Sequence, residues 1–154
     1  MNGLTTYGIT NFTLEEMVPP EVFNNYSPQR VIQFLDMRVW RAVQWIRSER
    51  GNAIYVNTWG INRPDWYPEF TGRGLRIPAG PGLVTSQHFY GRAADIDEVG
   101  IDNKELYQFC LDNQGKLLEF GITTIEHLDD TPTWIHLDCR NWFTDITAIQ
   151  IVRG

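Results

Sequence analysis

The amino-acid sequence predicts an α+β domain in which helices flank a central, largely antiparallel sheet. Apolar residues recur every three to four positions over 28–50 and over 102–119, a spacing typical of helices. Short runs rich in β-branched and aromatic residues, typical of strands, occur at 53–59, at 93–97 and three times after residue 121. A chain of 154 residues fits one domain, so we expect a single domain over 1–154.

The first predicted helix has clear start and stop signals. Ser27 is a good N-cap residue, Pro28 suits the first helical position, and Gly51 is placed to end the helix near Arg50. The predicted buried face consists of Val31, Leu35, Val39, Val43 and Ile46. Residues 1–27 contain Pro-Pro and Asn-Asn pairs and are predicted to be irregular.

The rest of the chain predicts a long loop, a second helix and further strands. AIYVNTW at 53–59 and AADID at 93–97 predict strands, and the glycine- and proline-rich stretch 60–85 between them predicts a loop. Asp102 and Glu105 resemble a capping box that opens a helix to about Glu119, with Gly121 at its end. ITTIEHL, TWIHLDC and DITAIQIV then predict three strands separated by short turns.

Charge and composition narrow the classes of partner. The formal net charge of −6 argues against a nucleic acid or an anionic membrane held by bulk electrostatics. No apolar run approaches the ~18 residues of a membrane span, and the N-terminus lacks the basic and apolar regions of a signal peptide. We therefore expect no membrane insertion, and synthesis in the cytoplasm with release by another component. Cys110 and Cys139 are predicted to be reduced, partly buried thiols.

Histidine and aspartate residues supply the candidate chemistry. A catalytic zinc site needs three protein ligands from His, Asp or Glu, and one open position for water. His88 and Asp95 lie seven positions apart across a glycine, so a loop and the following strand can bring them to one point. His136 lies within TWIHLD, where Trp134, His136 and Asp138 share one face of a strand. A histidine there is either packed in the core or directed into a site.

Two motifs give this set a family resemblance. SQHFYGRAAD matches the pattern S-x-H-x-x-G-x-A-x-D of the zinc D-Ala-D-Ala carboxypeptidase and dipeptidase family, which includes phage endolysins. All five specified positions are met, by Ser86, His88, Gly91, Ala93 and Asp95. TWIH at 133–136 resembles the family's second motif, W-x-H, and NFTLEEM, VNTWG and GRGLR resemble its earlier segments.

The resemblance implies a fold, a cofactor and a ligand set. The fold would be of the hedgehog/DD-peptidase type, with a zinc ion (Zn²⁺) held by His88, Asp95 and His136. Gly91 and Ala93 would be small so that the ligand loop can close on itself. Three further residues would bond to a ligand or contact substrate: Ser86, Asp138 and Trp134. Trp59 and Trp142 are further candidates for the wall of a groove.

The general base is predicted from the same resemblance. Several branches of the family place Glu three residues before the last histidine, where this chain has Thr133. If 122–127 and 133–138 form a hairpin, Glu126 would lie across from the ligand strand and reach the catalytic water. Asp130 and Asp129 are alternatives.

An arginine is expected beside the metal. Arg76 resembles the family's arginine that holds a substrate carboxylate or stabilises the oxyanion, for which a guanidinium is well suited. Arg63 and Arg73 are alternatives.

The expected function is that of a zinc peptidase that acts on peptidoglycan stem peptides. The resemblance implies D-Ala-D-Ala carboxypeptidase or L-Ala-D-Glu-type endopeptidase activity, in a monomer encoded by a phage or prophage and active on the cell wall or in the virion. Two hypotheses of other classes remain. One is a non-catalytic metal-binding or virion structural module on the same fold, and the other is a serine hydrolase that uses Ser86 with His88.

Overall fold

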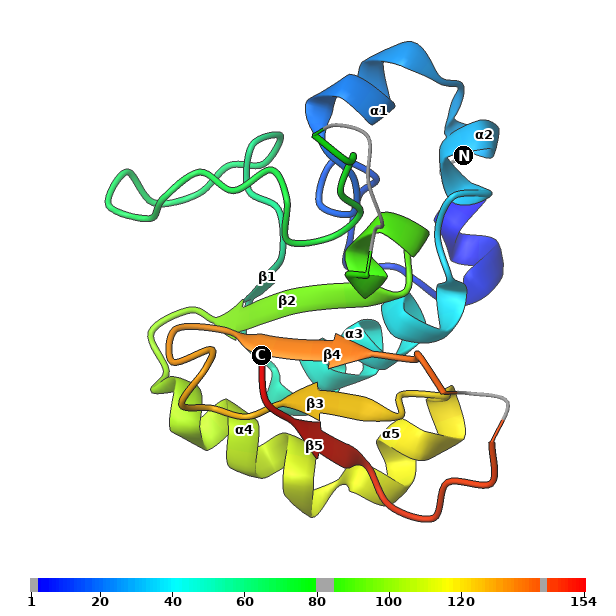
Figure 1. Ribbon diagram of the computed structural model, residues 1–154. Coiled ribbons are helices and arrows are strands. Elements are labelled where there is room, and N and C mark those ends of the chain that lie inside the picture. Colours follow the sequence, from blue (N-terminus) through cyan, green and yellow to red (C-terminus); the bar gives the residue numbers. More distant parts are fainter. Residues whose placement is uncertain (1–2, 80–84, 142–143) are drawn as a thin grey trace.

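A five-stranded sheet organises the molecule, as shown by a computed structural model that describes residues 3–79, 85–141 and 144–154 (Figure 1). The strands are β1 (Ile54–Tyr55), β2 (Ala93–Glu98), β3 (Thr124–Glu126), β4 (Ile135–Asp138) and β5 (Gln150–Val152). Their order is β1-β2-β4-β3-β5, and every pairing is antiparallel except β3 with β5. The predictions of an α+β class and of a β3–β4 hairpin are therefore confirmed.

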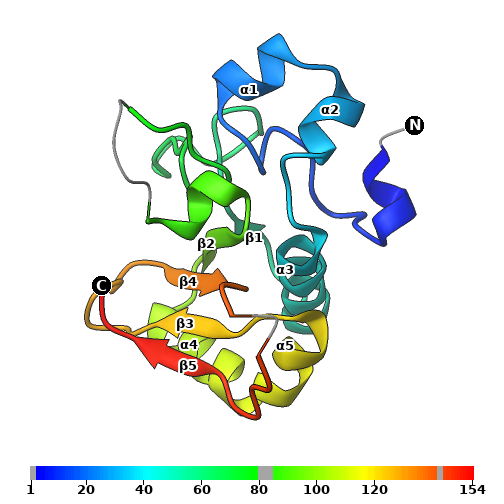
Figure 2. The same ribbon diagram turned by 45° about the vertical axis from the view of Figure 1, so that its right-hand side comes forward.

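Helices of different lengths cover one side of this sheet and extend beyond one of its edges. The α-helices are α1 (Pro20–Asn25), α2 (Pro28–Ile32), α3 (Met37–Arg50), α4 (Asn103–Asp112) and α5 (Gln114–Phe120), and the 3-10 helices are η1 (Gly3–Tyr7) and η2 (Gln87–Tyr90). In both views α3, α4 and α5 lie on one side of the sheet, whereas α1 and α2 lie beyond its β1–β2 edge (Figures 1 and 2). No helix in the three described ranges has both the length and the apolar character needed to cross a membrane.

Both predicted long helices are in fact broken, and the 28–50 prediction is wrong at residues 33–36. The Asp36 carboxylate caps α3 by accepting the N–H of Arg38 at 3.1 Å. The Asp36 N–H donates to the carbonyl oxygen of Gly91 at 3.0 Å, so it is not part of a helical ladder. Because Gly91 is more than fifty positions away in the chain, the helical spacing of apolar residues could not predict this hydrogen bond or the break that it makes.

The 102–119 prediction is wrong at Asn113. The Asn113 side chain donates to the carbonyl oxygen of Phe109 at 2.8 Å, and the residue leaves helical geometry with φ −107° and ψ 22°. Asparagine side chains compete with the backbone in this way, and the chain restarts as α5. Gly51 and Gly121 end α3 and α5 with positive φ, as predicted.

Other predicted boundaries also change. Residues 1–27 contain η1 and α1, so the prediction of irregular structure there is wrong in part. The predicted strand 53–59 is reduced to β1, because the N–H groups of Asn57 and Thr58 donate to loop carbonyls of Glu16 and Phe70. The strand predicted at 145–152 is paired only over β5. The predicted 60–85 loop holds no helix or strand in 60–79 and 85, and residues 80–84 lie outside the described residues.

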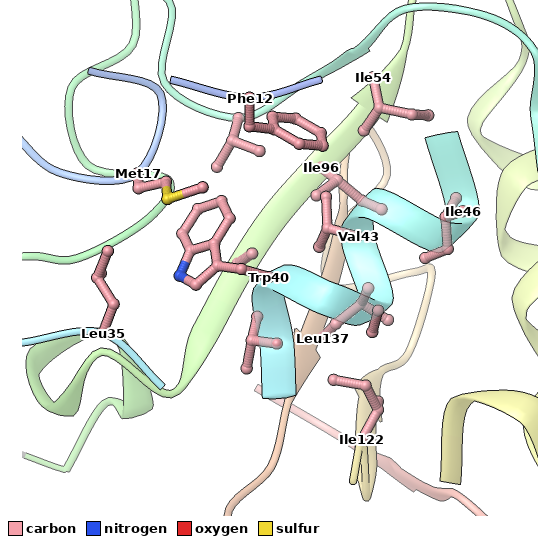
Figure 3. Packing of buried hydrophobic residues seen from close by; sticks show 14 of the residues in the cluster. Phe12, Met17, Leu35, Trp40, Val43, Ile46, Ile54, Ile96, Ile122 and Leu137 are labelled. Atoms are coloured by element: carbon pink, nitrogen blue, oxygen red, sulfur yellow. The ribbon is translucent and has the colours of Figure 1, made fainter. Parts of the chain in front are cut away.

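The core lies between α3 and the sheet. The predicted face of the first helix is buried throughout, and Figure 3 shows Val43 and Ile46 near Ile96 of β2 and Leu137 of β4. Since side chains alternate along a strand, the residues between these apolar ones face the opposite side of the sheet. That opposite face carries Asp95, His136 and Asp138.

The two cysteines are buried free thiols, as predicted. Burial raises the pKa of Cys110 and of Cys139 to about 12, so both remain protonated at neutral pH.

Candidate metal centre

Three predicted ligands converge on one point of the sheet. His88 comes from η2, Asp95 from β2 and His136 from β4, and all three are buried. His88 Nε2 lies 3.1 Å from Asp95 Oδ1 and 3.2 Å from His136 Nδ1, and His136 Nδ1 lies 2.8 Å from Asp95 Oδ1. A tetrahedral metal with ligand bonds of about 2.0–2.1 Å separates its ligand atoms by about 3.3 Å. The buried cluster therefore has the donor atoms and the spacing to bind a metal ion.

Strand register brings two of these ligands together. Asp95 and His136 are direct partners across β2 and β4. Opposite residues of an antiparallel pair project to the same face, about 5 Å apart. The pairing of β2 with β4 is therefore enough to bring Asp95 and His136 together, and only His88 depends on a loop.

Gly91 directs the turn that brings His88 to the same point. Its φ is 66°, and a Cβ there would lie 2.0 Å from the carbonyl oxygen of Phe34. Only glycine fits, because the turn packs against the segment between α2 and α3. The small size expected of Gly91 is therefore also needed where the turn packs against this distant segment.

The second nitrogen of each imidazole is also bonded. His88 Nδ1 lies 2.7 Å from the carbonyl oxygen of Gly74, to which it must donate. His136 Nε2 lies 3.0 Å from Asp138 Oδ2. These bonds fix the tautomers and leave His88 Nε2 and His136 Nδ1 with lone pairs for a metal. Asp138 thus contacts a ligand, in the position expected for it.

Asp138 is itself held by Arg140. The carboxylate of Asp138 is fully buried, and the Arg140 Nε lies 2.9 Å and 3.0 Å from its two oxygens. Burial would raise the pKa of Asp138, but the hydrogen bonds from His136 and Arg140 outweigh it and lower that pKa. The group behind His136 is therefore a carboxylate at neutral pH.

Asp95 and His136 have shifted pKa values. Burial disfavours the Asp95 carboxylate, yet hydrogen bonds from His136 and His88 outweigh burial and lower the Asp95 pKa. Burial likewise disfavours charged His136, but its bonds to Asp138 and Asp95 raise the His136 pKa to about 9. Without a metal, a proton on His136 balances the two carboxylates, so metal binding must displace a proton.

A pocket of about 300 Å³, the metal pocket, opens onto the cluster. It is lined by Arg76, Thr85, Ser86, Gln87, His88, Asp95, Glu126, Trp134, His136, Arg140, Val152, Arg153 and Gly154. Most predicted site residues therefore border one cavity.

Glu126 reaches this pocket through the β3–β4 pairing. Thr124 pairs with Asp138 and Ile125 with Leu137, so the same register sets Glu126 opposite His136 on the ligand face. Asp95, His136 and Glu126 thus form a row across β2, β4 and β3. Asp129 and Asp130 lie in the turn after β3, where Arg153 approaches their carboxylates at 3.3 Å and 3.5 Å, and neither lines the pocket.

Of the three candidate arginines, only Arg76 directs its guanidinium to a ligand side chain. Its Nη2 lies 2.7 Å from Asp95 Oδ2, and its side chain is 40% exposed at the edge of the pocket. Arg63 bonds to the carbonyl oxygen of Tyr67 and to Glu69 within its own loop. Arg73 is buried in an ion pair with Asp97.

Ser86 and Trp134 also line the metal pocket. Both ring nitrogens of His88 are engaged by Gly74 and by the cluster, so the geometry does not support a Ser86–His88 nucleophile pair. The Trp59 indole N–H donates to the carbonyl oxygen of Val18 instead of lining the pocket, and Trp142 lies outside the described residues.

Sequence reasoning missed six lining residues: Thr85, Gln87, Arg140, Val152, Arg153 and Gly154. Arg140 follows His136 and Asp138 at the two-residue spacing of a strand face, a signal that could have indicated it. Val152 and Arg153 reach the pocket because β5 pairs in parallel with β3, which no local pattern reports.

Comparison of the chain with protein-family models, with curated proteins and with solved structures found no match.

Proposed function

We propose that this chain is a zinc-dependent peptidase that hydrolyses amide bonds in peptidoglycan stem peptides, on a fold of the hedgehog/DD-peptidase type. The observation that carries the proposal is the convergence of His88, Asp95 and His136, with ligand atoms 2.8–3.2 Å apart, beside a pocket that Glu126 and Arg76 also line. The peptide substrate is suggested by the SQHFYGRAAD and TWIH motifs. A phage or prophage origin, and action on the wall after release or within a virion, follow from the same resemblance.

The donor set fits a catalytic zinc ion. Two imidazoles and one carboxylate would provide three protein ligands, and the metal pocket that these residues line would give water and substrate access to the ion. When bound, zinc supplies a Lewis acid that polarises a carbonyl group and lowers the pKa of a neighbouring water.

The protein side chains would perform the remaining steps. Glu126 accepts the proton of the attacking water and then delivers it to the amine that leaves. Arg76 donates hydrogen bonds to the oxyanion or to a substrate carboxylate, and Trp134 packs beside the substrate. Asp138 keeps His136 in the tautomer that exposes Nδ1.

Metal content and wall hydrolysis together test this function. We expect one zinc per chain, and release of stem-peptide fragments from purified peptidoglycan by the zinc-loaded protein. His88→Ala and His136→Ala should lose both properties, whereas His127→Ala should retain them, because His127 does not line the metal pocket. Substoichiometric metal in the native protein, or full metal content in either ligand variant, would contradict the site.

The second candidate is a non-catalytic metal-binding or virion structural module. It is favoured by Thr133, which stands where several branches of the family have their glutamate. Stoichiometric zinc without hydrolysis of peptidoglycan or synthetic stem peptides would support this candidate over the peptidase.

A further inference from the structure

Two arginines line the metal pocket without taking part in the proposed reaction. Arg140 follows β4 and Arg153 follows β5, and both border the pocket together with Glu126. The pKa of Arg140 is raised chiefly by its bond to Asp138 and also by the nearby charge of Glu126. Val152 pairs with Glu126, so Arg153 is one residue from the partner of that acid. The wall around Glu126 therefore carries two cations.

Arg140 is fixed in place with one end of its guanidinium unused. Its Nε lies 2.9 Å and 3.0 Å from the two carboxylate oxygens of Asp138, and its Nη2 also donates to that carboxylate. Asp138 is fully buried, so the guanidinium is anchored rigidly. Nη1 has no hydrogen-bond partner within residues 3–79, 85–141 and 144–154, and the side chain is 34% exposed. An anchored guanidinium with free donors is preorganised to bind a ligand in the pocket.

Arg153 is held much more loosely. Its Nη2 lies 3.3 Å from Asp129 Oδ2, its Nη1 lies 3.5 Å from Asp130 Oδ1, and its side chain is 61% exposed. Exposed ion pairs of this kind add little to stability, so Arg153 can exchange these partners for a ligand at small cost. In both views the chain after β5 turns toward β4 (Figures 1 and 2).

These two arginines differ from Arg76 in their place on the sheet. Arg76 pairs with Asp95 of β2, whereas Arg153 follows β5, and β4 and β3 lie between these strands. A guanidinium donates paired hydrogen bonds that match the two oxygens of a carboxylate. Arg140 and Arg153 also offset the negative charge of Glu126, so a second carboxylate can bind near it.

We propose that Arg140 and Arg153 bind a carboxylate of the substrate and so select acidic stem peptides. The proposal rests on the proposed peptidase function and names the substrate class of the same site, whichever amide bond is cut. Two groups of a stem peptide have this chemistry: the free carboxylate of its glutamate residue and its C-terminal carboxylate. Conversion of the bound group to an amide removes the charge with little change in shape.

Three synthetic stem peptides test the proposal. One has both carboxylates free, one has the glutamate carboxylate as an amide, and one has the C-terminal carboxylate as an amide. We expect one of the two amides to lower kcat/KM of the zinc-loaded protein roughly tenfold, as for the loss of hydrogen bonds to a charged group, and that amide identifies the group. Equal kcat/KM for all three peptides would overturn the proposal and leave the peptidase function standing.

Binding separates this proposal from the peptidase function. The Kd of each peptide is measured by isothermal titration calorimetry with zinc-loaded Glu126→Gln protein, in which slow turnover keeps the peptides intact. The same amide should weaken binding roughly tenfold. Absence of turnover in the unchanged protein would overturn the peptidase function, and the ratio of Kd values would still decide whether the pocket binds a carboxylate.

Variants connect the preference to the two arginines. Arg153→Gln and Arg140→Lys should each reduce the tenfold preference to about threefold or less, with one zinc per chain. Arg140→Lys keeps a cation beside Asp138 but loses the planar guanidinium, and if it also loses zinc, Arg153→Gln alone decides. Arg41→Gln is the control, because Arg41 is exposed on α3 and does not line the metal pocket. A full preference in Arg153→Gln and in zinc-loaded Arg140→Lys would overturn the proposal.

Discussion

The two faces of the central sheet use alternate residues of the same strands for opposite purposes. On the helix-covered face, Ile96, Ile135 and Leu137 are fully buried among apolar side chains. On the other face, Asp95, His136 and Asp138 are also buried, but among polar partners bonded to one another. Burial on one face is favoured by the hydrophobic effect, whereas burial on the other requires every polar group to be paired.

The comparison indicates a functional division between the two faces of each strand. The apolar face holds β2 and β4 in register, and that register places Asp95 opposite His136. A change on the apolar face should therefore alter stability, and a change on the polar face should alter metal binding or catalysis. Four predictions test this division, beginning with the largest effect.

Glu126→Gln should remove the general base and leave the fold and the ligands intact. We expect kcat/KM on stem peptides to fall by roughly 10²–10⁴-fold with zinc content unchanged. Glu119→Gln is the matched control, because Glu119 is an exposed acid on α5 paired with Lys116. Unchanged activity in Glu126→Gln would show that another group supplies the base.

Leu137→Ala should create a cavity on the apolar face between two ligand-face residues. Leu137 is fully buried, so we expect the free energy of unfolding to fall by about 2–5 kcal/mol, measured by urea denaturation. Zinc affinity of the folded protein should change little. A large loss of affinity without loss of stability would contradict the division between the faces.

The pH dependence of stability should differ between the metal-free and the zinc-loaded protein. The pKa of His136 is raised from 6.5 to about 9, so its contribution is fully present below pH 6.5 and is lost as the pH rises through 9. The loss in metal-free protein should be on the order of 3 kcal/mol, measured by urea denaturation at pH 6 and pH 9.5 with a chelator. In zinc-loaded protein the metal replaces the proton, so this loss should be absent. If metal-free His136→Ala loses as much free energy of unfolding between pH 6 and pH 9.5 as the unchanged protein does, the pH dependence cannot be assigned to His136.

Asp138→Asn should have the smallest effect. The variant keeps the volume of the side chain but weakens the bond that orients His136, so zinc affinity should fall by roughly 10–100-fold. Competition with a chromogenic chelator measures the loss. Asp112→Asn, on the exposed end of α4, provides the control and should retain native affinity.

Much of the ligand set and the fold class was predictable from the sequence. Helical spacing, strand composition and terminal glycines are local signals, so the α+β class and the ends of α3 and α5 follow from them. His88, Asp95 and His136 were predicted as ligands because SQHFYGRAAD and TWIH resemble the zinc-ligand motifs of a known family. The break at Asp36 was not, since it depends on a bond to Gly91.

By itself, then, the sequence determined the residue types at the cluster and the strands that carry two of them. Only the tertiary structure decided which of the three candidate acids reaches the metal pocket: the register of β3 on β4 brings Glu126 there, while Arg153 pairs with Asp129 and Asp130 in the turn. It also decided that the guanidinium of Arg76 pairs with the ligand Asp95 whereas that of Arg73 pairs with Asp97. The physical reason is the same in each case, because register and ion pairing join segments far apart in the chain, and no local pattern encodes the partner.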